Sequence, residues 1–362
     1  MADKGVFITG AGGFLGRYIL AHYLQRTDCD LFLLENGPFC KRLQAFVEAA
    51  SPRSQVRIMD GDITRPDLGL DAATREELKS RVTHAIHLAA IYNLSAPRDL
   101  SLRVNVDGTR HVLDFLETVK HFRKLAHTST LVVAGTYSGV FTEDDFDKGQ
   151  SFKNYYEETK FLSEKLVRER LSTVPAVIFR PGVVVGDSKT GYIEKIDGPY
   201  YVFVTIKRYL HVVLPDCGAT RCQIAPVDFV TEGFYTLFER EDVPAGTVFY
   251  LMDPHPLTYN EFFDLACERW ERIKPVLRLP QWLMKPIAQI GVVGKLTGIP
   301  WKAFMYGDQV IEYRIEKSAA ALAKYGIRCP SVPSYIDVMI RYFREHYRDG
   351  TVRRERWWER TA

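Results

Sequence analysis

Short apolar runs alternate with longer segments of helical periodicity along the first half of the chain. The run Gly5–Thr9 (G-V-F-I-T) is typical of a buried parallel strand, and a helical stripe from Phe14 to Leu24 follows it. Further strands are predicted at 31–34, 56–59, 84–88, 125–130 and 176–180, and further helices over 102–119 and 156–171. This alternation predicts an α/β fold in which helices cover both faces of a doubly wound parallel sheet.

The alternation fades after Arg180. Residues 186–223 are predicted to form loops and one helix. A Thr-x-x-Glu capping box that begins at Thr258 opens a predicted helix over 258–272. A last helix is predicted over 333–348.

The fading periodicity predicts a first domain, residues 1–185 with a return segment near 220–250, and a smaller, mostly helical lobe, residues 186–362. Within this lobe, polar residues interrupt the apolar stretch 282–301 too often for a membrane-spanning helix. Its pattern allows a helical flap over a tunnel or a peripheral contact with a membrane surface.

The composition is that of an ordinary globular protein. Of the 362 residues, 46% are hydrophobic and 26% charged, and 48 basic against 45 acidic residues leave a net charge of +3. Because no strong positive field results, we expect no nucleic-acid partner. The six cysteines form no C-x-x-C pair, and no apolar leader opens the chain. These features predict reduced thiols, no metal site and a cytoplasmic location.

A glycine-rich turn joins the first predicted strand to the first predicted helix, with the sequence Thr9-Gly10-Ala11-Gly12-Gly13-Phe14-Leu15-Gly16. Its glycines permit a tight turn, close approach of the backbone to a pyrophosphate, and packing of the helix on the strand. The helix N-terminus supplies N–H groups to the phosphates. The turn predicts a dinucleotide site, and the alternative is a glycine-rich turn that holds no ligand.

Two acidic residues follow later strands. Glu35 ends the second strand, where a carboxylate accepts hydrogen bonds from the adenosine ribose and repels a 2′-phosphate. This favours NAD(H), although Lys41 and Arg42 lie close enough to leave NADP(H) open. Asp62, after the third strand, is placed to meet the adenine amino group, and the alternative is a turn aspartate.

Tyr156 and Lys160 form a Y-x-x-x-K pair on one face of a predicted helix. The nearby ammonium is expected to lower the pKa of Tyr156, so that its phenol can give a proton to a carbonyl oxygen as hydride arrives. Lys160 can also hold the nicotinamide ribose. Thr130 ends the fifth strand, and its hydroxyl is expected to hydrogen-bond the same carbonyl oxygen.

Together these motifs resemble those of the extended short-chain dehydrogenase/reductases over about residues 4–235. The resemblance rests on the glycine turn, Asp60-Gly61-Asp62, His87-Leu88-Ala89-Ala90, Val104-Asn105-Val106-Asp107-Gly108-Thr109, Tyr156 with Lys160, and Arg180-Pro181-Gly182. It implies a Rossmann fold in which Tyr156 is the acid/base, Lys160 holds the ribose and Thr130 orients the carbonyl. It also implies that NAD is bound by Gly10, Gly12, Gly13, Phe14, Leu15, Gly16, Glu35, Asp62, Ile63, Leu88, Ala89, Ala90, Asn105, Lys160, Pro181, Gly182 and Val183.

One branch of that superfamily is most similar. His127-Thr128-Ser129-Thr130 resembles the H-x-S-T of fatty acyl-CoA reductases and thioester-reductase domains, and 180–191, 197–201 and 326–330 are similar to the same branch. That branch commonly carries an arginine where Glu35 stands. Because this chain has no adenylation or carrier domain, the resemblance implies a substrate delivered as an acyl-CoA or on an acyl-carrier protein.

The region after Arg180 is unusually aromatic, which suits a small hydrophobic molecule, although a second small core is the alternative. We hypothesise an NAD(P)H-dependent reductase of an acyl thioester, aldehyde or lipophilic ketone. The alternatives are a nucleotide-sugar epimerase or dehydratase with tightly bound NAD, and a dinucleotide sensor without catalysis. The resemblance further implies a homodimer formed through the helices at 101–119 and 156–171.

Overall fold

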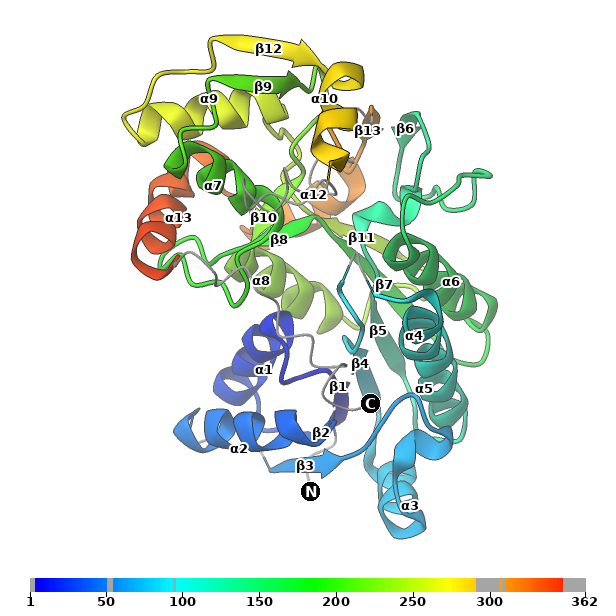
Figure 1. The fold of residues 1–362 in the computed structure, drawn as a ribbon. Helices are drawn as coiled ribbons and strands as arrows, with labels where there is room; N and C mark the ends of the chain where they lie inside the picture. Colours follow the sequence, from blue (N-terminus) through cyan, green and yellow to red (C-terminus); the bar gives the residue numbers. More distant parts are fainter. Residues whose placement is uncertain (1–3, 51–54, 94–95, 291–305, 308–309, 348–362) are drawn as a thin grey trace. The chain divides into compact units, whose positions relative to one another are not determined.

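The computed structural model describes residues 4–50, 55–93, 96–290, 306–307 and 310–347. The chain forms two compact units, each built from several segments (Figure 1). The first comprises Met1–Gly182, Asp228–Pro254 and Tyr313–Arg328, and the second comprises Val183–Val227, His255–Glu312 and Cys329–Ala362. The first unit thus includes Tyr313–Arg328, a segment that the sequence analysis placed in the second lobe.

A seven-stranded parallel sheet organises the first unit, with strand order β11-β7-β5-β4-β1-β2-β3. The order reverses between β1 and β4, and ligands of such sheets bind beside this switch point at the carboxyl ends of the strands. The predicted α/β fold is confirmed, and all six predicted strands are present. The strands are β1 (Gly5–Thr9), β2 (Asp30–Glu35), β3 (Val56–Asp60), β4 (His84–His87), β5 (Lys124–Thr128), β7 (Ala176–Pro181) and β11 (Val248–Leu251).

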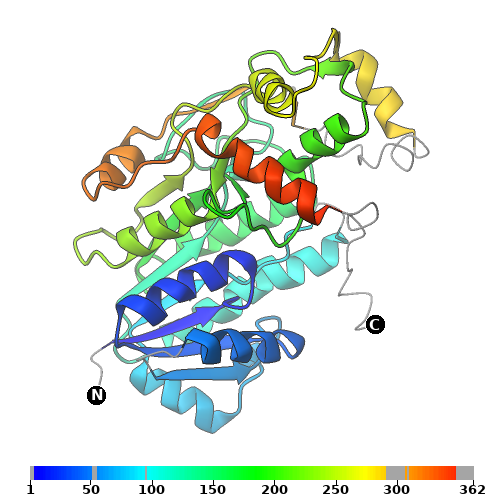
Figure 2. The same ribbon diagram turned by 90° about the vertical axis from the view of Figure 1, so that its left-hand side faces the viewer.

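Helices cover both faces of this sheet, with α1, α2 and α8 on one face and α3 to α6 on the other (Figure 1). Figure 2 views the face covered by α1 and α2. The predicted helix over 102–119 contains a π-helical turn, η2 (Leu102–Asp107), before α5. The helices are α1 (Phe14–Arg26), α2 (Pro38–Ala50), α3 (Ala72–Arg81), α4 (Arg98–Ser101), α5 (Gly108–Glu117), α6 (Tyr155–Glu169) and α8 (Val227–Phe238).

One hydrophobic core cluster of the first unit lies between the sheet and the helices of the α5 face. Phe7, Phe32 and Leu125 from the strands and Leu113 and Leu116 from α5 belong to one buried cluster. Full burial of each such side chain contributes about 1.5–3 kcal/mol. This packing fixes the carboxyl ends of β1, β4 and β5 as a rigid base for the candidate site.

The segment Tyr313–Arg328 joins the first unit through polar contacts. The Tyr313 hydroxyl donates to the backbone oxygen of Leu131 at 3.0 Å, and the Ser318 backbone N–H and hydroxyl both donate to the Glu143 carboxylate at 2.9 Å. Its assignment to the first unit therefore depends on contacts between residues distant in the sequence. The remaining elements here are η1 (Pro66–Gly69), η3 (Leu131–Ala134), β6 (Gly139–Phe141), β13 (Ile311–Tyr313) and α12 (Glu316–Ala323).

The second unit packs helices around an aromatic core that includes Phe203, Trp270 and Phe343. The predicted capping box is confirmed, because the Thr258 hydroxyl and the Glu261 carboxylate bond each other's backbone N–H groups. The parallel pairs β8 with β10 and β9 with β12 were not predicted. The elements are β8 (Val183–Val185), η4 (Gly198–Tyr200), α7 (Tyr201–Lys207), β9 (Val213–Asp216), β10 (Ile224–Pro226), α9 (Tyr259–Arg269), β12 (Leu277–Pro280), α10 (Gln281–Gln289) and α13 (Val332–His346).

The apolar stretch predicted at 282–301 begins in α10, and its residues 291–301 lie outside the described part of the chain. Among the described residues, no helix is both long enough and apolar enough to cross a bilayer. None of the six cysteines, all of which lie in the described residues, forms a disulfide. The described residues contain no group of three or more His, Cys, Asp or Glu side chains suited to hold a metal ion.

Candidate active site

The fold itself requires two glycines of the turn after β1. Gly10 has a positive φ of 78°, and a Cβ there would lie 2.6 Å from the backbone nitrogen of Ala89. A Cβ on Gly16 would lie 2.1 Å from the Gly10 oxygen. Because both contacts are with backbone atoms that cannot move aside, these glycines set the close packing of the turn against α1 and the end of β4.

Gly13 and the first turn of α1 fit an anionic ligand. Among the described residues, a Cβ on Gly13 would meet only the Gly10 oxygen, at 3.4 Å, an ordinary contact distance. Gly13 is the N-cap of α1, no side chain caps the helix, and its first turn, which includes Phe14 and Leu15, has no acidic residue. The N–H groups there and the helix dipole favour a phosphate, so this turn fits the pyrophosphate of a dinucleotide.

Glu35 lies beside this turn, as the sequence predicts. Its carboxylate accepts a hydrogen bond from the Gly12 N–H at 2.5 Å, and its side chain is buried. Desolvation raises the pKa of Glu35, while hydrogen bonds from the backbone N–H groups of Gly12 and Asn36 oppose this rise. The carboxylate therefore stands at the carboxyl end of β2, where an adenosine ribose would meet it.

The other predicted adenosine contacts occupy the neighbouring loop. Asp62 accepts a hydrogen bond from the Thr64 backbone N–H at 2.8 Å, which closes a turn. The Ile63 side chain packs against Gly108, where an added Cβ would lie 2.7 Å from Ile63 Cδ1. Both residues therefore have structural roles in the loop after β3, and their contact with a cofactor stays a prediction.

Asn105 holds the loop after β4 to α6. Its side-chain oxygen accepts from the Ile91 N–H at 2.8 Å, and its Nδ2 donates to the Thr159 hydroxyl at 2.9 Å. The Leu88 N–H donates to the Thr9 oxygen at 3.0 Å, which keeps this loop, with Ala89 and Ala90, beside the end of β1. Asn105 is thus a fully bonded structural amide.

Pro181, Gly182 and Val183 follow the end of β7. The Gly182 N–H donates to the Leu251 oxygen of β11 at 3.1 Å. Val183 belongs to β8 of the second unit, where its N–H donates to the Gln223 oxygen at 2.8 Å. The structure thus assigns Val183 to a different unit from the glycine turn, and its contact with a cofactor stays a prediction.

Thr130 and Tyr156 meet at the carboxyl end of β5. A side-chain hydrogen bond joins their hydroxyls, although 26 positions separate them in the chain. Tyr156 lies in the first turn of α6, which Asn154 caps by accepting from the Glu157 N–H at 3.1 Å. Its ring also packs edge-on against Tyr92 at 5.1 Å between centroids. The two hydroxyls that are predicted to act on one carbonyl oxygen are therefore neighbours, and their catalytic roles stay a prediction.

Lys160 is buried one turn further along α6. Its ammonium donates to the backbone oxygen of Thr128, at the end of β5, at 2.6 Å. Desolvation lowers the pKa of Lys160 to about 8, and the charge of Glu164 opposes this shift.

The expected lowering of the Tyr156 pKa is wrong for this structure. Desolvation raises the pKa of Tyr156 to about 12, and only the hydrogen bond with Thr130 opposes the rise. The expectation failed because it counted the charge of Lys160 but not the displacement of water from the phenol. At neutral pH the phenol therefore holds its proton.

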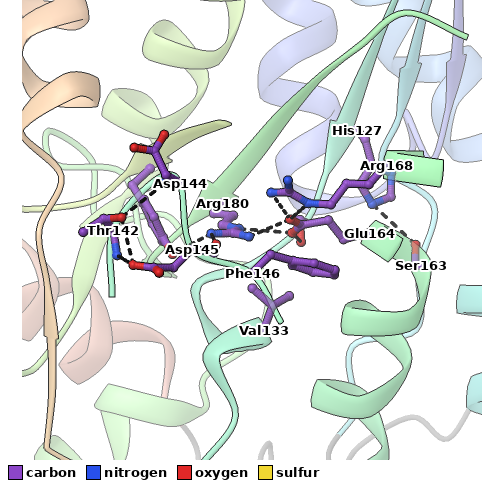
Figure 3. A network of polar contacts seen from close by, with 12 residues as sticks. His127, Val133, Thr142, Asp144, Asp145, Phe146, Ser163, Glu164, Arg168 and Arg180 are labelled. Atoms are coloured by element: carbon purple, nitrogen blue, oxygen red, sulfur yellow. Dashed lines mark hydrogen bonds and ion pairs between the residues drawn. The ribbon is translucent and has the colours of Figure 1, made fainter. Parts of the chain in front are cut away.

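A buried ion pair lies behind this site (Figure 3). Arg180 of β7 donates through Nε and Nη2 to Glu164 of α6 at 3.1 and 2.6 Å, and both side chains are fully buried. The Ser129 hydroxyl and Arg168 Nε also donate to Glu164, at 2.5 and 2.9 Å. The charge of Arg180 holds the pKa of Glu164 low despite its burial. Ser129 and Arg180 belong to sequence motifs, but neither motif predicts a contact with Glu164.

Two buried histidines, on the neighbouring strands β4 and β5, belong to a second buried polar network. His87 of β4 bonds the Thr9 hydroxyl at 2.7 Å and the Thr109 hydroxyl at 3.0 Å. Ser163 of α6 links Thr109, at 2.8 Å, to His127, at 3.4 Å. Desolvation lowers the pKa of His87 to about 3 and that of His127 well below its usual value, so both rings are neutral. Sequence reasoning missed this network, although both histidines lie in quoted motifs.

The strand order and the glycine turn at its switch point define a Rossmann-type dinucleotide-binding fold. A family model for an NAD-binding domain, described as "Male sterility protein", matches residues 8–234. The chain belongs to this family, in the thioester-reductase branch of the extended short-chain dehydrogenase/reductases.

The curated relatives are longer than this chain. "Fatty acyl-CoA reductase wat" of Drosophila melanogaster is 27% identical over 269 residues, which cover 62% of this chain and 52% of that protein. "Nonribosomal peptide synthetase asaC" of Aspergillus flavus is 30% identical over 294 residues, which cover 75% of this chain and 28% of that protein. The chain therefore spans about half of the first relative and about a quarter of the second.

Solved structures share the fold. The terminal R domain of the myxalamid biosynthetic pathway has a TM-score of 0.81 at 24% identity, covering 95% of this chain and 91% of that one. UDP-glucuronic acid 4-epimerase from Bacillus cereus, in complex with NAD, has a TM-score of 0.67 at 17% identity, covering 95% and 97%. At these identities the likeness is one of fold alone.

Proposed function

We propose that the protein reduces the carbonyl of a lipophilic acyl thioester with NADH or NADPH, releasing an aldehyde and a free thiol. The observation that carries the proposal is the hydrogen-bonded pair Thr130 and Tyr156 with buried Lys160 one turn along α6. Membership of the thioester-reductase branch supports the choice of substrate class. We also assign substrate recognition to the second unit, and the homodimer stays a prediction.

When bound, a reduced nicotinamide would supply the hydride that forms the new C–H bond at the carbonyl carbon. The C=O π electrons move to oxygen, where the Thr130 and Tyr156 hydroxyls donate hydrogen bonds to the developing charge. Tyr156 gives its proton to this oxygen. As the C–S bond breaks, the hydroxyl proton passes to the leaving sulfur, which gives the aldehyde and the free thiol. Reduction of the aldehyde to the alcohol would use a second molecule of reduced cofactor and a second proton from reprotonated Tyr156.

The raised pKa of Tyr156 suits a proton donor in this direction. With a pKa of about 12, the phenol stays protonated at neutral pH until an alkoxide forms on the substrate. An alkoxide is the stronger base, so the proton moves to it. The hydrogen bond with Thr130, which opposes the rise of the Tyr156 pKa, favours the phenolate that remains.

We expect the activity to fall above about pH 8 as Lys160 loses its proton. Its pKa is lowered to about 8, so the cation is present below this pH and lost above it. Between pH 8 and the ordinary lysine pKa, the unfolded chain binds a proton that the folded chain does not, so this group raises the unfolding free energy with pH. Deprotonation of Lys160 therefore does not by itself destabilise the folded chain in this window.

The measurement is a pH profile of kcat/KM for the wild type and for Lys165→Met, a matched variant of an exposed lysine on the same helix. Both profiles should break near pH 8. A wild-type profile that stays flat to pH 10 would refute the role of Lys160.

The position of Glu35 predicts a preference for NADH. Its buried carboxylate at the end of β2 would repel the 2′-phosphate of NADPH. Glu35→Gln removes the charge and keeps an oxygen that accepts from Gly12, so NADPH affinity should rise about tenfold relative to NADH, a change of about 1.4 kcal/mol. Fluorescence titration measures both dissociation constants. Glu48→Gln, exposed on α2, is the control, and a wild-type preference for NADPH would contradict this role of Glu35.

A substrate panel tests the proposed function against the epimerase alternative. The protein is incubated with NADH or NADPH and with acyl-CoAs of increasing chain length, fatty aldehydes or UDP-sugars. Net oxidation of the cofactor with acyl-CoA is the expected result. Conversion of a UDP-sugar without net oxidation would overturn the proposal in favour of a redox-neutral enzyme.

A further inference from the structure

Three segments of the second unit expose large apolar side chains. Tyr209, Val276 and Trp282 are 64%, 73% and 71% exposed, where a typical globular protein buries most of such surface. We call the surface formed by residues 207–213, 272–277 and 282–285 the β9–β12 patch. Its exposed apolar members are Tyr209, Leu210, Val212, Val213, Ile273, Val276, Leu277, Trp282 and Leu283.

The segments of the β9–β12 patch are neighbours in space. The N–H groups of Val276 and Leu277 both donate to the Val212 oxygen, at 3.0 and 3.2 Å, and Leu277 is in register with Val213. Arg272 donates to the Tyr209 hydroxyl at 2.9 Å. Helix α10, which carries Trp282, directly follows β12 and packs against both strands (Figure 1).

The β9–β12 sheet has one apolar face turned outward. On β9, Val213 is 40% exposed whereas Leu214, the next residue, is 6% exposed. Alternate side chains of a strand point to opposite faces, so Leu214 fills the core of the unit and Val213 faces away from it. An outward apolar face of this kind marks an interaction surface.

The charge of the same segments has one sign. The β9–β12 patch contains five basic residues, Lys207, Arg208, Arg272, Lys274 and Lys285, and no acidic residue. The whole chain carries only +3, so everything outside the patch sums to −2. Three acidic residues border the patch: Glu268 lies 3.6 Å from Lys274, and Asp216 and Glu271 are exposed at the ends of its segments.

We propose that the β9–β12 patch docks the protein peripherally on an anionic lipid bilayer. Exposed tryptophan and tyrosine favour the headgroup region, aliphatic side chains enter the acyl boundary, and the lysines and arginines face lipid phosphates. Charge selects this occupant over a second copy of the chain, because a two-fold contact would set like-charged segments against each other. The inference does not depend on the proposed reaction.

The test is co-sedimentation of the full chain with vesicles of phosphatidylcholine alone or mixed with phosphatidylglycerol. We expect binding to the anionic vesicles, weaker binding at high salt, and little binding to phosphatidylcholine alone. Lys274→Gln with Lys285→Gln should weaken binding about 25-fold, since each basic residue near an anionic surface contributes about fivefold, or about 1 kcal/mol. Val276→Ser should weaken binding several-fold.

The matched control is Lys324→Gln with Tyr325→Ser, an exposed basic and aromatic pair of the first unit, which should bind vesicles like the wild type. The dissociation constant of the reduced cofactor, whose predicted glycine turn lies in the first unit, should be unchanged in all variants, which separates this proposal from the proposed reaction. Absence of binding to anionic vesicles at low salt would overturn the inference. Equal binding by patch and control variants, or a patch variant that instead dissociates a dimer or a complex with an acidic carrier protein, would also overturn it.

Discussion

Replacing Tyr156 by phenylalanine is expected to lower turnover by about 10²–10⁴-fold while the dissociation constant of the reduced cofactor changes less than twofold. The variant removes the one hydroxyl that both bonds Thr130 and carries a transferable proton, and general acid catalysis contributes rate factors of this size. Stopped-flow kinetics of thioester reduction and a fluorescence titration of the cofactor measure the two effects separately.

Tyr155→Phe is the matched control, because Tyr155 lies on the same helix turn and its side chain is 47% exposed. Its turnover should equal that of the wild type. Full activity of Tyr156→Phe would remove Tyr156 from the mechanism, and equal losses in both variants would indicate damage to α6 instead.

Replacing Glu164 by glutamine is expected to lower the unfolding free energy by about 3–5 kcal/mol. The change leaves the Arg180 guanidinium buried without its counter-charge, and breaking one partner of a buried ion pair has this cost. Because the charge of Glu164 opposes the lowering of the Lys160 pKa, the alkaline fall in activity should also move to lower pH. Urea unfolding and the pH profile measure the two effects.

Glu158→Gln is the control for this change. Glu158 lies on α6, like Glu164, and pairs with Arg98 of α4 through solvent-accessible groups, and such pairs contribute at most about 1 kcal/mol. A loss of stability no larger in Glu164→Gln than in Glu158→Gln would show that the ion pair behind the site is dispensable.

The elements that local pattern determines were predictable. The strands from Gly5–Thr9 to Ala176–Pro181 follow from apolar runs, and the glycine turn and the Y-x-x-x-K pair follow from spacing. The V-F-Y-L run of β11 has the same apolar pattern as the other strands. It was not predicted as a strand because strands and helices no longer alternate regularly in that part of the sequence.

The long-range features were not predictable from one sequence. The bond of Ser129 and Arg180 to Glu164 joins three elements distant in the chain. The raised pKa of Tyr156 depends on how completely the fold displaces water from the phenol, which residue spacing does not encode. Pairing of β9 with β12 brings together strands about 60 residues apart, and a parallel pair of that separation leaves no local turn signal.

The central claim is that hydride passes from the cofactor to a thioester carbonyl beside Tyr156. The most direct measurement uses reduced cofactor labelled with deuterium at the transferred position, an acyl-CoA, and mass spectrometry of the acyl product. The account predicts one deuterium at the former carbonyl carbon of an aldehyde, or two in the alcohol, with one free thiol per acyl group. Release of the thiol with an unlabelled carboxylic acid, or recovery of intact thioester with every acyl-CoA tried, would contradict it.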